Sequence, residues 1–184
     1  MVFVNIGEFY FINDEYYEKF KNLKLMENKE MIDGVPSGRP CYYVFKDKDS
    51  SIYWMVPVSS QIEKYEKEYQ RSIEKYGICD GIVLSYFRGK KHAFLVQNMC
   101  PITDAYITNV FIDSNTDKPH IIPNKLKANI NANVRKAIRM YREKGKKIIQ
   151  SDAFYIEEVL LSEMDTEHES AVNLEDTSTE SSEV

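Results

Sequence analysis

Residues 38–64 hold two strand-like runs followed directly by a helix-like run, and this order constrains the fold more than any other feature. Residues 41–45 and 52–58 are rich in β-branched and aromatic side chains, which favours strands, and the polar residues 46–51 between them predict a hairpin turn. Apolar residues then recur three or four positions apart, which predicts a helix over residues 60–76. A hairpin that leads into a helix is typical of an α+β protein with an antiparallel sheet.

The second predicted strand ends in Ser59 and Ser60, and other polar groups are expected at the same place. A hairpin brings its two ends together, so Arg39 is expected beside the two serines. Ser60 followed by Glu63 fits a capping box, and Lys64 lies one turn into the helix. Because a helix N-terminus also favours anions, this junction is predicted to bind a phosphate. The commonest use of such serines is only as an N-cap.

Further elements are expected around the same sheet. A strand is predicted over residues 7–12, and a second hairpin over 82–96 with its turn at 88–91. The other expected elements are a helix over 14–25, a polar loop over 27–38, a strand or helix start at 105–111, a loop over 113–123, a helix over 125–145 and a last short element over 154–160.

The segment 125–147 carries an unusual imbalance of charge. Its apolar residues recur at helical spacing, and nine basic residues accompany one acid, Glu143. The nine are Lys125, Lys127, Arg135, Lys136, Arg139, Arg142, Lys144, Lys146 and Lys147. A charged helix face is usually only solvated, but this imbalance favours an electrostatic track for an RNA backbone. The predicted RNA contacts on this helix are Lys127, Arg135, Lys136, Arg139 and Arg142.

Five further residues are predicted to contact RNA, namely Tyr42, Lys90, Lys91, His92 and Asn98. Tyr42 and Tyr43 point to opposite faces of a strand, so one belongs to the core and the other is available to stack on a base. His92 has the chemistry of a general acid or base, although a lone histidine at a hairpin end is more often only exposed. Asn98 has the groups to read a base edge, or to close backbone groups at a strand end.

The net charge of −5 is concentrated at the C-terminus. Eight of the 29 acidic residues lie within residues 163–184, which contain no lysine or arginine, so the remaining 21 acids are outnumbered by 24 basic residues. Residues 1–162 are expected to form a single domain, and residues 163–184 an acidic, disordered tail. Such a tail usually only increases solubility, and the alternative is a phosphate mimic within the chain.

No motif for a metal or a cofactor is present in the sequence. Cys41, Cys79 and Cys100 are widely spaced and form no CxxC or Cys/His set, so they are expected to be small buried side chains in a reducing cytoplasm. No P-loop or dinucleotide fingerprint occurs, and no stretch is long enough to span a membrane. A cytoplasmic protein without a cofactor is therefore expected.

The order of these motifs resembles the toxins of type III toxin–antitoxin systems, in which a small RNA inhibits a protein endoribonuclease. The chain is similar to the CptN-like branch of the ToxN/AbiQ family over roughly residues 7–162. The matching pieces are residues 9–12, 14–17, 38–40, 56–60, 94–102 and 133–136. The most recognisable of them is the Pro-x-Ser-Ser sequence that ends at Ser60.

This resemblance implies a compact, twisted, mainly antiparallel sheet with surrounding helices, similar to the barrel-like core of the MazF/Kid toxins. It implies metal-independent cleavage of single-stranded, often adenine-rich RNA that leaves a 2′,3′-cyclic phosphate. It also implies an antitoxin RNA that is processed into pseudoknots, binds in the active groove and closes a heteromeric protein–RNA assembly. A role in phage defence is expected for such a toxin.

The resemblance also assigns catalytic residues. The serine pair of the family falls on Ser59 and Ser60, and its first basic residue falls on Arg39. The position of its second lysine is Ile62 here, so Lys64 is the nearest candidate. The expected catalytic residues are thus Arg39, Ser59, Ser60 and Lys64, with no general base assigned. The alternatives are a non-catalytic RNA-binding protein that uses the same groove and a protein-binding member of this fold class.

Overall fold

The computed structural model describes residues 4–5, 7–32, 35–46, 52–87, 89–146 and 148–179. The strands within this part are β1 (Phe9–Ile12), β2 (Lys29–Ile32), β3 (Val35–Gly38), β4 (Cys41–Lys46), β5 (Tyr53–Ser59), β6 (Val83–Phe87), β7 (Lys90–Phe94), β8 (Cys100–Ile102), β9 (Ile107–Val110), β10 (Ile112–Asp113) and β11 (Lys118–Pro119). The α-helices are α1 (Asp14–Lys19), α2 (Ile62–Tyr76), α3 (Asn124–Lys144) and α4 (Ala153–Thr179), and the short 3-10 helices are η1 (Val96–Asn98) and η2 (Asp104–Tyr106).

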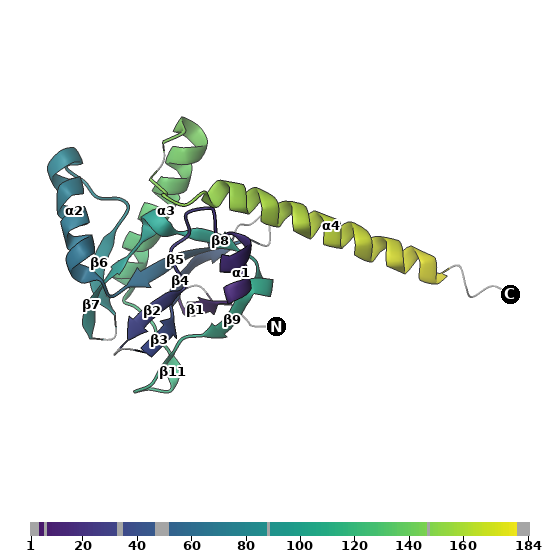
Figure 1. Cartoon of the computed structure of the whole chain (residues 1–184), viewed down its shortest axis with the longest axis horizontal. Helices are drawn as coiled ribbons and strands as arrows, with labels where there is room; N and C mark the ends of the chain where they lie inside the picture. The colour runs from purple at the N-terminus through teal and green to yellow at the C-terminus, as the bar shows by residue number, and fades with distance from the viewer. Residues whose placement is uncertain are drawn as a thin grey trace.

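Seven of the described strands form one antiparallel sheet, and the helices lie around it (Figure 1). The strand order is β6-β7-β5-β4-β1-β9, and β8 also pairs with β5. Two small hairpins, β2–β3 and β10–β11, stand apart from this sheet. The α+β class and the mainly antiparallel sheet predicted from the sequence are confirmed.

Strand β5 is the centre of the fold. It pairs with β4 along one edge, with Cys41 opposite Pro57, as the hairpin prediction requires. Its other edge is shared, because β8 pairs with its first half and β7 with Val58 and Ser59. Pro57 has no N–H to donate, and it lies where the partner changes from β8 to β7. Residues 54–59 of β5 are all buried, so the strand is covered on both faces.

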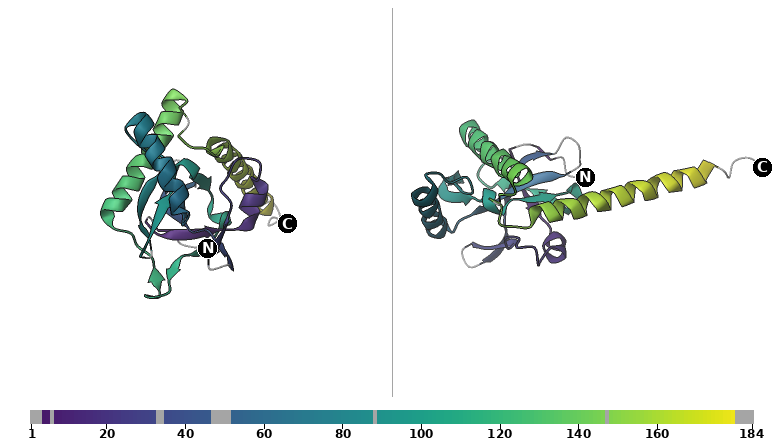
Figure 2. Two further views of the ribbon diagram at one scale, coloured as in Figure 1. Left: turned by 60° about the vertical axis from the view of Figure 1, so that its left-hand side comes forward. Right: turned by 90° about the horizontal axis from the view of Figure 1, so that it is seen from above.

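The helices cover different parts of the sheet. An apolar stripe on α3 that includes Ile130 and Val134 is buried, and α3 contacts β4 and β6. Helix α2 contacts β7, and Tyr65 on its buried face packs with Ala93 and Leu95. The first part of α4 contacts β8, with Ile156 fully buried. Figures 1 and 2 show α2 and α4 at opposite ends of the molecule, with α4 extending far beyond the body.

Both predicted loops contain a hairpin. The segment 27–38 holds β2–β3, with Ile32 opposite Val35, and Asp-Gly at 33–34 is the two-residue sequence signal for such a turn. The segment 113–123 holds the short β10–β11 pair. These polar runs were expected to be loops because their composition favours turns, and cross-strand hydrogen bonds between main-chain groups outweighed that preference.

Helix lengths also differ from the sequence predictions. Helix α1 is short, since it begins after the Asn13 cap and ends at Lys19. Helix α4 replaces the predicted short last element and continues to Thr179, past the domain boundary expected at residue 162. That boundary and the disorder expected for the acidic tail stay predictions, and residues 180–184 lie outside the described part.

Candidate functional site

The junction of β5 and α2 was expected to be a phosphate site. Ser59 pairs with Ala93 and is fully buried, and its Oγ accepts the Gln61 N–H at 3.2 Å. Ser60 is exposed, and its carbonyl accepts the Ile62 N–H at 2.7 Å. The helix cap is Gln61, which makes no side-chain capping bond, so the capping box predicted for Ser60 is wrong. The helix begins two residues later than expected, and this moves Ser60 outside the capping position.

Arg39 lies beside the end of β5, where the hairpin argument placed it. Its side chain is buried, with 4% of the residue exposed, and it donates from Nε to the Glu27 carbonyl and from Nη1 to the Val58 carbonyl, both at 3.0 Å. These bonds tie the end of β5 to the segment before β2. A guanidinium committed to main-chain carbonyls has a structural role, and its contact with phosphate stays a prediction.

Tyr17 of α1 is a second polar group beside Arg39. Its hydroxyl lies within hydrogen-bonding reach of Cys41. It is also close enough to Arg39 for the positive charge of the guanidinium to act on the pKa of the phenol. Burial raises the pKa of Tyr17 well above its ordinary value, despite the opposing effect of Arg39. A raised pKa makes a phenol a poorer general base, and the general base stays unassigned.

Lys64 is exposed on the first turn of α2. Its ammonium lies 5.0 Å from the centroid of the Tyr65 ring. This contact is a weak cation–π interaction at an exposed position, and it leaves the long side chain able to change rotamer. Lys64 is thus placed at the predicted junction, and its part in catalysis stays a prediction.

Tyr42 is a core residue. Its ring is fully buried and lies 5.2 Å from Phe9 and 6.4 Å from Phe94, and its hydroxyl has no hydrogen-bond partner among the described residues. Burial raises the pKa of Tyr42 to about 12. A ring with no exposed face cannot stack on a base, so the structure corrects the role expected of Tyr42. The side chain of Tyr43 lies outside the described part.

The β6–β7 hairpin carries Lys90, Lys91 and His92 next to this junction. Lys91 pairs with Glu66 of α2, and Lys90 is exposed. The His92 Nδ1–H donates to the Lys90 carbonyl at 3.0 Å, and the next residue, Ala93, pairs with Ser59. The pairing of β7 with the end of β5 therefore brings the residue next to His92 to the serine pair, which no sequence spacing indicated.

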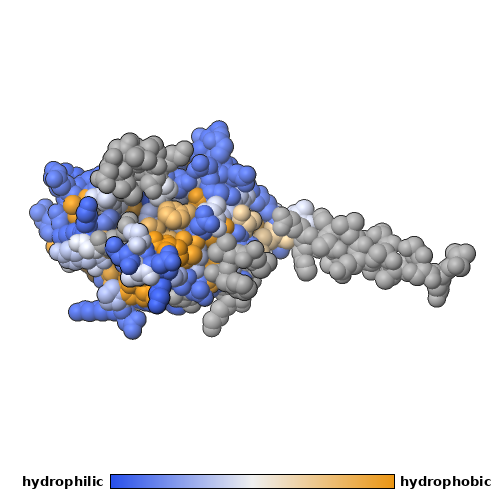
Figure 3. Space-filling model, turned by 90° about the horizontal axis from the view of Figure 1, so that it is seen from below, coloured by the Kyte–Doolittle hydropathy of each residue, from blue (hydrophilic) through white to orange (hydrophobic). Residues whose placement is uncertain are grey.

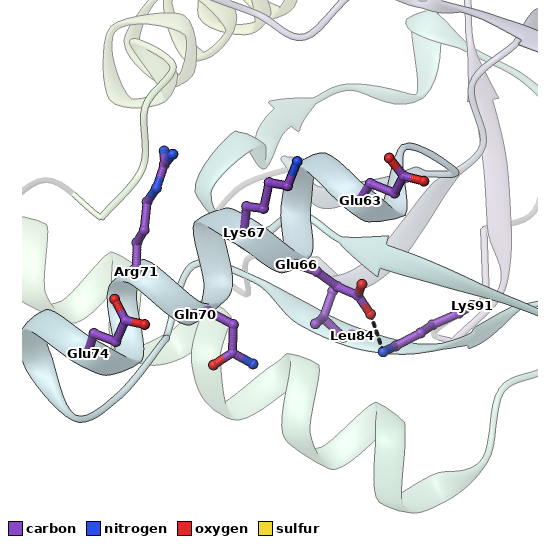
Figure 4. A pocket seen from close by; sticks show the side chains of 8 residues that line it. All are labelled: Glu63, Glu66, Lys67, Gln70, Arg71, Glu74, Leu84 and Lys91. Atoms are coloured by element: carbon purple, nitrogen blue, oxygen red, sulfur yellow. Dashed lines mark hydrogen bonds and ion pairs between the residues drawn. The ribbon is translucent and has the colours of Figure 1, made fainter.

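An open groove of about 690 Å³ runs along α2 on the side of β6 and β7 (Figure 4). It is lined by Glu63, Glu66, Lys67, Gln70, Arg71, Glu74, Leu84 and Lys91. Three of these eight residues are acids, and the Lys91 ammonium is paired with the Glu66 carboxylate within the groove. The mixed charge makes this groove a poor track for a polyanion.

Acids from other elements offset part of the positive charge on α3. Lys136 pairs with Asp80 at 2.7 Å, and Arg142 donates to both carboxylate oxygens of Glu157 at 2.8 and 3.1 Å. Lys127 is partly buried and lies over Gly7, where an added Cβ would come within 2.8 Å of its ammonium. Arg135 and Arg139 are exposed. Their RNA contacts stay predictions, and so does that of Asn98, which is partly buried in η1.

Two functional candidates in the structure were not predicted from the sequence. Tyr86 is 68% exposed on the edge strand β6, directly opposite Lys91. His120 pairs with Asp113 at 3.1 Å, across the β10–β11 hairpin that the sequence argument treated as a loop. Asp113 and His120 are seven residues apart in a segment predicted to be a loop, so their spacing gave no reason to place these two side chains together.

The described residues hold no group of three or more histidine, cysteine or acidic side chains arranged to bind a metal. Cys41 and Cys100 are buried, Cys79 is partly exposed, and all three are free thiols. No described helix is long and apolar enough to cross a membrane.

Comparison with known proteins relates this architecture to a solved structure. No protein-family model matches the chain, and no curated protein matches it. The fold is similar to that of AbiQ, a lactococcal anti-phage endoribonuclease belonging to the type III toxin–antitoxin system, with a TM-score of 0.58. The match covers 90% of this chain and 99% of AbiQ at 13% sequence identity. Likeness at this level of identity establishes the shared fold.

Proposed function

We propose that this protein is a metal-independent endoribonuclease toxin of a type III toxin–antitoxin system, in the CptN-like branch. The observation that carries the proposal is the fold shared with AbiQ along almost the full length of both chains. The ordered motifs of the sequence support the same assignment independently, because a residue pattern does not depend on the tertiary structure. Fold alone does not decide function, so the chemistry of the junction carries the next step.

The proposed reaction uses the ribose 2′-OH as its nucleophile, so the protein has to hold the phosphate in line and offset the charge that develops on it. Ser60 and Lys64 are both exposed, so a phosphate can reach them. Buried Ser59 and Arg39 shape the end of β5 behind these groups. Each donor aimed at the developing charge is expected to contribute about 3 kcal/mol, as in other anion holes.

RNA partners are proposed on both sides of the junction. The β6–β7 hairpin supplies Lys90, Lys91 and His92, and Asn98 lies beyond it. Helix α3 supplies Lys127, Arg135, Lys136, Arg139 and Arg142. Two of these, Lys136 and Arg142, would leave their ion pairs with Asp80 and Glu157 to bind a phosphate. We propose single-stranded, adenine-rich RNA as substrate, and a repeat-derived RNA pseudoknot as inhibitor in a heteromeric assembly. The protein would act in the cytoplasm, in phage defence.

The proposal is tested with purified full-length protein and a long single-stranded RNA in EDTA. Cleavage by the wild type that leaves 2′,3′-cyclic phosphate ends is expected, with a loss of about 100-fold or more in Ser60→Ala. Because Ser60 is exposed, the variant is expected to keep its thermal unfolding temperature. Ser72→Ala, on the far end of α2, is the matched control. No cleavage by the wild type, with any antitoxin RNA removed, would sink the proposal.

One observation favours the alternative of an RNA-binding protein without catalysis. Arg39, the strongest candidate for gripping a phosphate, is buried against two carbonyls. A binding module needs only the basic hairpin and the exposed arginines of α3. Tight RNA binding with a steep salt dependence, and no products after long incubation, would establish this alternative.

A further inference from the structure

Two of the three histidines of the chain contact the same phenylalanine ring. The His92 ring meets Phe87 edge-on, with centroids 5.3 Å apart, and the His120 ring meets it edge-on at 4.8 Å. His92 lies on β7, and His120 directly follows β11, so two hairpins far apart in sequence deliver the two imidazoles to one place. Aromatic contacts of this kind fix the orientation of each ring.

His120 is held in one tautomer. Its Nδ1–H donates to Asp113 Oδ2 at 3.1 Å, while Asp113 Oδ1 accepts the Asn115 N–H at 2.9 Å and so keeps the carboxylate in place. Phe9 and Phe111 also flank the ring, at 5.9 and 6.5 Å. The side chain of His120 keeps 18% exposure. Nε2 is then the atom that can exchange a proton with a ligand.

His92 is oriented in the same manner by a main-chain group. Its Nδ1–H donates to the Lys90 carbonyl, which leaves Nε2 as the proton acceptor. The next residue, Ala93, pairs with Ser59 of β5, so His92 lies on the strand that borders the junction already proposed to hold the phosphate. The two imidazoles and the strand end therefore belong to one part of the surface.

The charges around the pair suit a phosphate. Lys90 and Lys91 precede His92 on its own strand, and Glu66 of α2 pairs with Lys91. On the other side, Lys118 lies opposite Asp113 in the β10–β11 hairpin. Tyr86, the exposed phenol of β6, lies opposite Lys91 and is a further titratable group near His92 among the described residues.

Apolar surface beside the pair suits a base. Ile112 precedes Asp113 and is 41% exposed, and Ile121 follows His120 and is 64% exposed. Figure 3 looks onto the face from which the β10–β11 hairpin projects, and an apolar area bordered by hydrophilic residues occupies it. Exposed aromatic and apolar side chains are what unstacked bases of single-stranded RNA pack against.

We propose that His92 and His120 are the general acid–base pair of the endoribonuclease, an inference that rests on the proposed function. His92 Nε2 takes the proton of the ribose 2′-OH, and the 2′ oxygen forms a bond to phosphorus. The bond from phosphorus to the 5′ oxygen breaks, and His120 gives its Nε2 proton to that oxygen. The products are a 2′,3′-cyclic phosphate and a 5′-OH, and exchange with water returns both rings to their starting states.

The geometry assigns these two roles. Asp113 stays hydrogen-bonded to His120 Nδ1 whether or not Nε2 carries a proton, so His120 can hold and release a proton without moving. The Nδ1–H of His92 donates to the Lys90 carbonyl, so its Nε2 is the atom that can take the proton of the 2′-OH. Asp113 is a positioning residue, because it acts through His120 and does not touch the substrate.

The test compares His92→Ala and His120→Ala with the wild type on an RNA oligonucleotide that spans one mapped cleavage site, in EDTA. Each variant is expected to lose about 10²–10⁴-fold in rate, and the bell-shaped dependence of the wild-type rate on pH is expected to lose one limb in each. His168→Ala, which removes the third histidine, on α4, is the matched control and is expected to keep the wild-type rate.

A second substrate separates a proton donor from a structural residue. It carries sulfur in place of the bridging 5′ oxygen at the cleaved linkage, and sulfur leaves without being protonated. His120→Ala is expected to cleave this substrate within about tenfold of the wild type, whereas His92→Ala stays slow. Loss of activity in His120→Ala that this substrate does not restore would show that the histidine only holds the β10–β11 hairpin, and would overturn its role as the acid.

Other outcomes are equally decisive. Wild-type rates in both single variants would overturn the inference and leave the proposed function intact, whereas a wild type that never cleaves RNA would remove both. If His120→Ala does not fold, His120→Gln keeps a donor toward Asp113 without an imidazole, and it is expected to fold and to show the same loss. Asp113→Asn is expected to slow cleavage about tenfold, with a shifted pH profile.

Discussion

At the scale of the residue, burial decides what a polar side chain does. Arg39 was expected to grip a phosphate because a guanidinium at a strand end suits that role, and the structure has it 4% exposed and bonded to two carbonyls. Tyr42 was expected at the RNA surface and is fully buried. Neither burial follows from residue type, because both residues also occur on surfaces, and only the packing of neighbouring elements determines it.

Replacing Arg39 with alanine is expected to lower the free energy of unfolding by about 3 kcal/mol. The change leaves the Glu27 and Val58 carbonyls without their charged donor, and buried acceptors that lose a partner are costly. Urea unfolding measures the effect, with Arg71→Ala as control, since Arg71 projects from the exposed face of α2 (Figure 4) and its loss should cost less than about 0.5 kcal/mol. A stable Arg39→Ala variant without activity would instead assign Arg39 to catalysis.

At the scale of the element, ion pairs between elements change the meaning of a charge count. The excess of basic residues on α3 is a fact of the sequence, but Asp80 and Glu157 come from segments before and after the helix and neutralise two of them. A count along one helix cannot include such partners. Arg142 is therefore expected to stabilise the fold through Glu157 in addition to its proposed contact with RNA, whereas the exposed Arg139 is expected to act on RNA alone.

Arg142 and Arg139 are expected to behave differently when each is changed to alanine. Arg142→Ala should lower the free energy of unfolding by about 1–2 kcal/mol, because Glu157 is 7% exposed and loses its cation. Arg139→Ala should leave stability within about 0.5 kcal/mol but weaken RNA binding and reduce its salt slope by about one. Urea unfolding and binding titrations at several salt concentrations measure both. Equal effects of the two variants on the free energy of unfolding would contradict this difference.

At the scale of the whole molecule, the body and the acidic end of α4 are expected to be separable. Ile156 and Leu160 anchor the start of α4 in the core, and the ion pair of Glu163 with Lys19 is described beyond them. A chain that ends at residue 162 should keep its unfolding free energy within about 1 kcal/mol, because that pair is partly exposed. Thermal unfolding and circular dichroism test this. A large loss would contradict the predicted domain boundary, and tighter RNA binding by the shorter chain would support the phosphate-mimic role.

Stability is also expected to fall in alkaline solution. Burial raises the pKa of Cys100 from 9.0 to about 12, and raises the pKa of Cys41 as well. Below pH 9 both states hold the proton, and above it the unfolded state releases the proton while the folded state keeps it. The free energy of unfolding should therefore fall from pH 9 toward pH 12, by up to about 1.4 kcal/mol per pH unit for each thiol.

Urea unfolding at a series of pH values measures this slope. Cys100→Ala removes one buried thiol, so its free energy of unfolding should fall less steeply above pH 9 than that of the wild type. An unchanged slope in this variant would show that other groups cause the alkaline loss.

The sequence by itself determined the α+β class, the β4–β5 hairpin and helices α2 and α3, because these depend on local periodicity and on turn residues that act within a few positions. Only the tertiary structure decided that Arg39 and Tyr42 are buried, and that Asp113 orients His120. It also brought His92 and His120 to one phenylalanine ring. These contacts join distant segments through the packing of two hairpins, and the energies that determine such packing depend on neighbours in space, which spacing along the chain does not encode.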